Sequence, residues 1–199
     1  MLSTLAFVLA VGTADGKDPA PIKNPKLREE LLARVEKEQA ARHRIIEANA
    51  AGKKLNPTEF AQVLGLDKDN REWLKGVVEK HGWPGKSLVG EDGAHAAWLL
   101  VQHADPDLPF QKKCLDLMKA VVKAGEVEKK DLAYLTDRVL SNEGKKQLYG
   151  TQLVQADGRM VPKPIEDEDK VDERRKEVGL QSLAEYLKIA TEAYKPKKP

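Results

Sequence analysis

The sequence predicts a mainly α fold, a helical bundle with one packed β-hairpin. Two helix-start signals, Asn24-Pro25 and Asn56-Pro57, each combine an N-cap side chain with a proline at the first helical position. Ser182 and Glu185 have the spacing of a capping box. Asp157-Gly158 is a dipeptide favoured in two-residue hairpin turns. Because a lone hairpin is marginally stable in water, we expect it to pack on the helices.

The N-terminal half is expected to form three helices. The first covers residues 25–49, and its thin apolar stripe is interrupted by Arg42. We therefore expect it to pack along one side of the domain or against a partner. The second start signal opens a short helix that carries Phe60 and Leu64, and a separate helix covers residues 69–82.

The most apolar stretch of the chain, residues 93–103, follows a loop over residues 83–90. A helix that is apolar on most faces belongs at the centre of a bundle. The remaining expected elements are helices over residues 110–124 and 131–140, a return strand over 159–164, a charged helix over 169–178 and a last helix from Ser182.

The first strand of the hairpin is expected over residues 147–155, where the hydrophobic period changes from helical to extended. In a strand, Tyr149 and Thr151 face one side, while Gly150 and Gln152 face the other. We expect Gln152 to face the helices, because Gly150 beside it leaves room for a ligand or for a close backbone.

Four segments are expected along the chain: a signal segment and spacer (1–21), an N-terminal helical extension (22–66), the main domain (67–194) and a basic tail (195–199). The run MLSTLAFVLAV at the start is too short to span a bilayer and resembles the apolar region of a secretory signal, although no Lys or Arg precedes it. We expect an exported or periplasmic protein. The alternative is a cytoplasmic protein with a loosely packed N-terminal strand or helix.

Composition excludes several function classes. The 34 Lys and Arg residues nearly balance 32 Asp and Glu residues, so the net charge of +2 does not favour nucleic acid as a partner. No transmembrane span is expected. The single cysteine, Cys114, allows no intramolecular disulfide and lies on an apolar stripe, which indicates a buried structural thiol. The sequence contains no phosphate-binding glycine loop, HExxH, GxSxG or dinucleotide motif, so the cofactor is unknown.

Candidate site residues gather at the ends of the expected elements. A histidine oriented by a nearby carboxylate can act as a general acid–base, which makes His103, Asp105 and Asp137 the candidate catalytic residues. The candidate binding residues are Trp83, Gln102, Arg138, Tyr149, Thr151, Gln152, Arg174 and Arg175.

Each candidate also has a structural interpretation. His103 can cap a helix, Asp105 can occupy a turn, and Asp137 can form a structural salt bridge. Arg174 and Arg175 can lie on a solvated face. We predict no metal site, although a mixed site formed by His103, Asp105 and Asp137 is chemically possible.

Several of these residues lie in motifs that resemble a known family. The order and the residues of these motifs resemble those of a family of uncharacterised bacterial proteins, domain of unknown function 6624. The resemblance covers roughly residues 70–190, leaves residues 22–65 outside, and implies one domain but no activity. Its motifs are Trp83-Pro84, QHAD (102–105), LAYLTDRV (132–139), QLYGTQ (147–152), Pro164-Ile165 and DERRKEVGL (172–180).

Three functions remain open. The first is a hydrolase or group-transfer enzyme in which His103 is the acid–base, Asp105 or Asp137 orients it, and Arg138 or Arg175 holds an anionic substrate group. The second is a non-catalytic module of the cell envelope that binds an unknown small molecule. The third is a protein-interaction module that uses the long first helix. Convergence of His103, Asp137 and Gln152 on one pocket, with Trp83 at its edge, would favour the first two.

Overall fold

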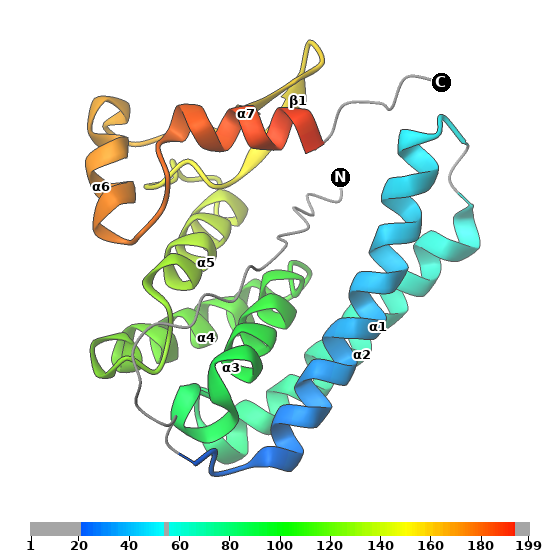
Figure 1. Ribbon diagram of the computed structural model, residues 1–199, viewed down its shortest axis with the longest axis vertical. Coiled ribbons are helices and arrows are strands. Elements are labelled where there is room, and N and C mark those ends of the chain that lie inside the picture. Colours follow the sequence, from blue (N-terminus) through cyan, green and yellow to red (C-terminus); the bar gives the residue numbers. More distant parts are fainter. Residues whose placement is uncertain (1–20, 54–55, 194–199) are drawn as a thin grey trace.

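The computed structural model describes residues 21–53 and 56–193 and confirms the mainly α fold (Figure 1). This part of the chain forms seven α-helices and one two-stranded antiparallel hairpin. None of its helices is both long enough and apolar enough to cross a membrane. The expected signal segment, apart from residue 21, and the basic tail lie outside the described residues.

Helices α1 (Pro25–Ala50) and α2 (Pro57–His81) lie side by side along one edge of the molecule (Figure 1). The side chains of Asn24 and Asn56 accept hydrogen bonds from backbone N–H groups of the first turns, at 3.1 and 2.9 Å, as expected of N-caps. The prediction of two short helices within residues 57–82 is wrong, because α2 is one continuous helix. Buried Val63 and Leu74 lie in its two halves, and Gly65 between them is tolerated inside a helix at modest cost.

Helix α3 (Lys86–Gln102) is central, because it contacts α1, α2, α4 (Leu108–Val121) and α5 (Lys129–Asn142). A short 3₁₀ turn, η1 (Val122–Ala124), follows α4. The first turn of α3 occupies part of the expected loop, and a kink separates it from the rest of the helix at Gly90, where φ is 77°.

The main hydrophobic core lies among α1 to α5 and includes Leu31, Leu74 and Leu135, which are fully buried. Cys114 is buried there as expected, and burial raises the pKa of its thiol to about 12, so it remains protonated. Trp98, in the most apolar helix, is only half-buried and packs at the edge of this core.

The C-terminal elements form a second, smaller core. Strands β1 (Leu153–Ala156) and β2 (Arg159–Pro162) are joined by a two-residue turn, and a 3₁₀ turn η2 (Glu168–Lys170), α6 (Val171–Glu177) and α7 (Leu183–Ala193) follow. The hairpin packs on a helix, as expected: β2 lies against α7. Tyr134 of α5 packs against this second core and so links it to the bundle.

The expected strand over residues 147–155 is wrong for its first six residues, because β1 begins at Leu153. The segment 147–152 is irregular, and the alternation of its side chains therefore fails. Gly150 adopts a left-handed φ of 70°, and a Cβ there would lie 2.9 Å from both Ile165 and Leu183. Protein side chains, rather than a ligand, thus fill the space beside this glycine.

Candidate functional site

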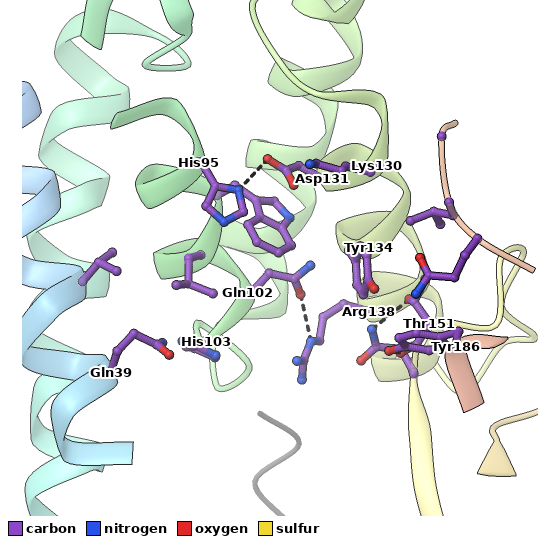
Figure 2. Close-up of a pocket in the computed structure, with 17 residues that line it drawn as sticks. Gln39, His95, Gln102, His103, Lys130, Asp131, Tyr134, Arg138, Thr151 and Tyr186 are labelled. Carbon is purple, nitrogen blue, oxygen red and sulfur yellow. Dashed lines mark hydrogen bonds and ion pairs between the residues drawn. The ribbon is translucent and has the colours of Figure 1, made fainter. Parts of the chain in front are cut away.

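A cavity of about 440 Å³ lies between the helical bundle and the C-terminal elements (Figure 2). Helix α3 supplies one wall through residues spaced i, i+3, i+4 and i+7, which share one face of a helix. The wall consists of His95, Trp98, Leu99 and Gln102, with His103 at its end.

Helix α5 supplies a second wall through a similar stripe, and α1 and the C-terminal segment close the cavity. The α5 residues are Lys130, Asp131, Tyr134 and Arg138. The remaining lining residues are Val35 and Gln39 of α1, Thr151, Gln152, and Gly179, Leu180, Gln181 and Tyr186 near the C-terminus. A cavity of this size, lined by both apolar and polar side chains, is typical of a small-molecule site.

Gln102, His103, Arg138, Thr151 and Gln152 are the sequence-predicted site residues that line this cavity. Both Thr151 and Gln152 face it, which an extended strand would not allow. Of the residues expected to converge on one pocket, His103 and Gln152 both line the cavity, whereas Asp137 and Trp83 do not.

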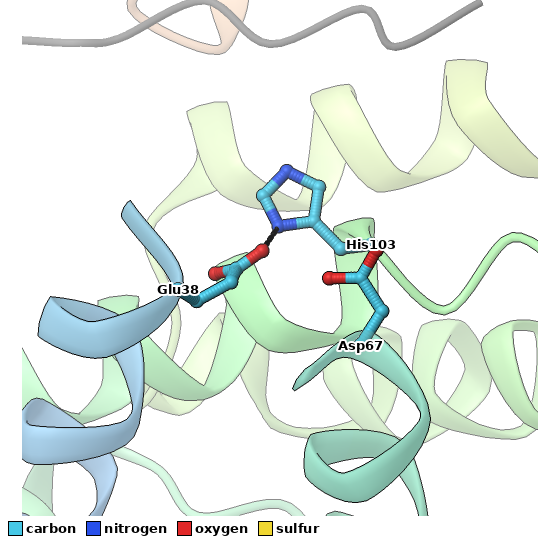
Figure 3. A group of neighbouring side chains, drawn as sticks. All are labelled: Glu38, Asp67 and His103. Carbon is cyan, nitrogen blue, oxygen red and sulfur yellow. Dashed lines mark ion pairs between the residues drawn. The ribbon is translucent and has the colours of Figure 1, made fainter. Parts of the chain in front are cut away.

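His103 is paired with Glu38 of α1, so the expected pairing with Asp105 or Asp137 is wrong (Figure 3). The Nδ1 atom of His103 contacts Glu38, and the second ring nitrogen points away from that carboxylate. Glu38 is fully buried and also accepts a hydrogen bond of 2.7 Å from Arg42. Burial acts to raise the pKa of Glu38, but His103 and Arg42 outweigh it and hold that pKa below its ordinary value.

Asp67 of α2 completes this group, and ligand atoms of Glu38, Asp67 and His103 lie within 4.8 Å of one another. The Arg42 guanidinium, however, is bonded to both carboxylates. Burial raises the pKa of Asp67, although Arg42 opposes the shift. Because Arg42 already supplies the positive charge that an ion would bring, we interpret the group as an internal salt-bridge network.

A second histidine–carboxylate pair, His95 and Asp131, lies on the same cavity (Figure 2). The Nδ1 atom of His95 is 3.0 Å from Asp131 Oδ2, and Asp131 is only 4% exposed. The imidazole stacks on Trp98 with a centroid distance of 4.7 Å.

Asp105 lies outside the cavity lining and instead positions Arg138. The Nη1 group of Arg138 donates to Asp105 at 3.0 Å, and its Nε donates to the side-chain oxygen of Gln102 at 3.0 Å. Asn142 also donates to Asp105, at 3.0 Å. Arg138 is thereby held at the cavity by two fixed acceptors.

Asp137 is fully buried behind Thr151 and organises the irregular segment 147–152. Its carboxylate accepts backbone hydrogen bonds from Leu148 at 2.7 Å, Tyr149 at 3.0 Å and Thr151 at 2.9 Å, and one from the Thr151 hydroxyl at 2.9 Å. Burial raises the pKa of Asp137, although these hydrogen bonds oppose the shift. The residue therefore shapes the cavity wall without lining it.

Trp83, Tyr149, Arg174 and Arg175 are also outside the lining. Trp83 is buried in the main core rather than at the edge of the cavity. Arg174 donates to the backbone oxygen of Leu148, and fully buried Arg175 donates to that of Tyr149. The expectation of a solvated face is wrong for Arg175.

Sequence reasoning missed Glu38, His95 and Asp131. The i,i+4 spacing of Glu38 and Arg42 was the available signal, since it places an acid and a base beside each other on the apolar stripe of α1. The i+3 and i+7 spacings from His95 to Trp98 and Gln102 were a second signal, because they place these three side chains on one face of a helix.

Comparison with known proteins agrees with the earlier resemblance. A model of the family described as "Family of unknown function (DUF6624)" matches residues 25–198. No curated protein and no solved structure matches the chain. The matched range includes α1 and α2, so the expectation that these residues lie outside the resemblance is wrong, and Glu38 lies within the family's range.

Proposed function

Because the chain belongs to DUF6624, a family of unknown function, we propose its activity from the geometry of the cavity. The proposed activity is hydrolysis or group transfer on a small molecule, with His103 as the general acid–base. Glu38, rather than Asp105 or Asp137, is the residue that orients it.

The pairing of His103 with Glu38 is the observation that carries this proposal. The contact of Nδ1 with a buried carboxylate favours the tautomer in which Nδ1 carries the proton and Nε2 is free to accept one. The His103 side chain lines the cavity and is 8% exposed, so few orientations are open to it.

The chemistry requires one proton to move in two steps. Nε2 of His103 accepts a proton from water while the water oxygen bonds to the acyl carbon or phosphorus of the substrate. The bond to the leaving oxygen then breaks, and the same proton passes from Nε2 to that oxygen. In group transfer an alcohol takes the place of water. Arg138 is placed to stabilise negative charge on the substrate.

Turnover of p-nitrophenyl esters and p-nitrophenyl phosphate by His103→Gln tests the proposal. We expect kcat/KM to fall about 10²- to 10⁴-fold, the usual contribution of a general acid–base. His43→Gln is the matched control, because His43 lies on α1, is 64% exposed and is not part of the cavity lining. Circular dichroism of both variants checks that they fold.

Two outcomes would contradict the assignment. Loss of turnover in His95→Gln but not in His103→Gln would give the acid–base role to the His95–Asp131 pair. Ligand binding by the wild-type protein without turnover of any of these esters would favour a binding module instead.

A further inference from the structure

Two buried donors on α3 have no hydrogen-bond partner within the described part of the chain: Nε1 of Trp98 and Nε2 of Gln102. Both residues line the cavity, and their spacing of four places them on the same face of the helix. Gln102 is 3% exposed, and its amide nitrogen points away from the Arg138 contact made by its oxygen (Figure 2). Since buried donors are nearly always paired, this pair indicates an acceptor that a ligand supplies.

Location distinguishes these two atoms from the unpaired indole nitrogen of Trp83. The Nε1 atom of Trp83 is also buried without a partner among the described residues, but Trp83 lies in the main core rather than on the cavity. It therefore serves as an internal reference for a donor that no ligand in this cavity can reach.

The charges around the cavity favour a negatively charged acceptor. Arg138 and Lys130 both line it, and neither contact of Arg138 with Gln102 and Asp105 uses its Nη2 group. The Asp131 carboxylate, next to Lys130 on α5, is engaged by His95. Glu38 lies behind His103 and is bonded to Arg42.

The rest of the lining suits an apolar body. Val35, Leu99 and Leu180 contribute aliphatic surface, and Tyr134 and Trp98 contribute aromatic rings 5.9 Å apart in an edge-to-face arrangement. A cavity of about 440 Å³ is much larger than an inorganic anion needs and falls in the range of small-molecule sites.

We propose that the cavity binds a small organic oxyanion with an apolar or aromatic body. Its oxygen atoms accept hydrogen bonds from Trp98 Nε1 and Gln102 Nε2, and its charge faces Arg138. The inference rests on the proposed function only in using the same cavity, since binding requires no turnover by His103.

Titration of the ¹⁵N-labelled full chain with phenylacetate tests the proposal through the indole N–H signals of its three tryptophans. We expect the Trp98 signal to move downfield on binding and the Trp83 signal to stay in place. Trp98→Phe assigns the first signal and removes the donor while keeping an aromatic ring.

Comparison ligands separate the features of the oxyanion. Phenylacetamide and phenethylamine should bind at least 10-fold more weakly, because they lack the charge or reverse it. Acetate and inorganic phosphate should also bind more weakly, because they lack the apolar body. Phenyl phosphate distinguishes a phosphate ester from a carboxylate as the preferred source of the oxyanion. Equal affinity for phenylacetate and phenylacetamide would overturn the proposal, as would tight binding of inorganic phosphate.

Gln102→Glu is the sharpest variant, because it keeps the oxygen that accepts from Arg138 but replaces the free donor with negative charge. We expect at least a 10-fold loss of phenylacetate affinity. Gln62→Glu, at an exposed position of α2, is the matched control and should bind normally. Unchanged phenylacetate affinity in Gln102→Glu would contradict the inference.

The two proposals fail in different ways. Phenylacetate binding to wild-type protein that hydrolyses no ester supports this inference and removes the acid–base proposal. Turnover of neutral esters with no binding of phenylacetate or phenyl phosphate overturns this inference and leaves the acid–base proposal standing.

Discussion

At the scale of single residues, several charged side chains that resemble site residues build the wall of the cavity. Asp137 accepts the backbone N–H groups of residues 148, 149 and 151, while Arg174 and Arg175 donate to the backbone oxygens of residues 148 and 149. An irregular buried segment must satisfy its backbone groups without a β-ladder, and these three side chains do so. Their role is to position Thr151 and Gln152.

Asp137→Asn should therefore lower the free energy of unfolding by about 2–3 kcal/mol, since hydrogen bonds to a buried charged acceptor are among the stronger ones. An amide keeps one acceptor oxygen but turns a nitrogen toward donors. Chemical denaturation measures the change. Asp116→Asn is the control, because Asp116 is 76% exposed, and it should stay within about 0.5 kcal/mol of wild type. Equal stability of the two variants would show that Asp137 does not support the segment.

At the scale of elements, the hairpin depends on its turn. Asp157 and Gly158 connect Ala156 to its partner Arg159 with φ values of 50° and 73°. Both left-handed conformations are those of a type I′ turn, whose twist matches that of the strands. Aspartate tolerates this region and glycine occupies it without a Cβ penalty.

Gly158→Ala should destabilise the protein by about 1–2 kcal/mol, because a Cβ strains the left-handed backbone although open space surrounds it. Gly76→Ala tests a glycine whose replacement by alanine should raise stability instead of lowering it. Gly76 is exposed within α2, with no atom within 4 Å of an added Cβ, and alanine there should stabilise by up to about 1 kcal/mol. Thermal unfolding of both variants compares them, and a loss of stability in both would contradict the argument.

At the scale of the whole molecule, Glu38, Arg42, Asp67 and His103 connect three helices, α1, α2 and α3, in one network beside the cavity. The cavity itself lies between the main core and the smaller C-terminal core, which Tyr134 links. The stability of the network and the shape of the site are therefore coupled.

Glu38→Gln should change how the stability of the protein depends on pH, because it removes one ionisable group of this network. The pKa of Glu38 in the folded chain is below its ordinary value near 4.5, so its ionisation stabilises the fold above that pH. This contribution is lost as pH falls toward the folded pKa. We expect the variant to be less stable than wild type by about 1–3 kcal/mol at pH 7, and the difference to shrink below about pH 4.5.

Denaturation at a series of pH values measures this difference. The raised pKa of Asp67 acts in the opposite direction, and Glu38 contributes to that rise, so Glu38→Gln also lowers the pKa of Asp67 and makes the measured difference smaller. Glu36→Gln, at an exposed position of the same helix, should show no such dependence on pH. A stability difference between wild type and Glu38→Gln that does not change with pH would contradict the role given to the carboxylate.

The sequence by itself determined the local features of this protein. Asn24-Pro25, Asn56-Pro57, Ser182 with Glu185, and Asp157-Gly158 act through groups a few residues away, and each is found where local physics predicts it. Five predicted site residues line the cavity because motifs at the ends of elements are brought together when those elements pack.

Only the tertiary structure decided the partners of the charged groups. His103 is 65 positions from Glu38, and Asp105 is only two positions away, yet the packing of α1 on α3 brings Glu38 to the imidazole. Segment 147–152 is predicted from the sequence to begin a strand, but a buried carboxylate from α5 accepts hydrogen bonds from its backbone N–H groups. Burial strengthens electrostatic interactions and makes unpaired groups costly, so distant residues outweigh local pattern at these positions.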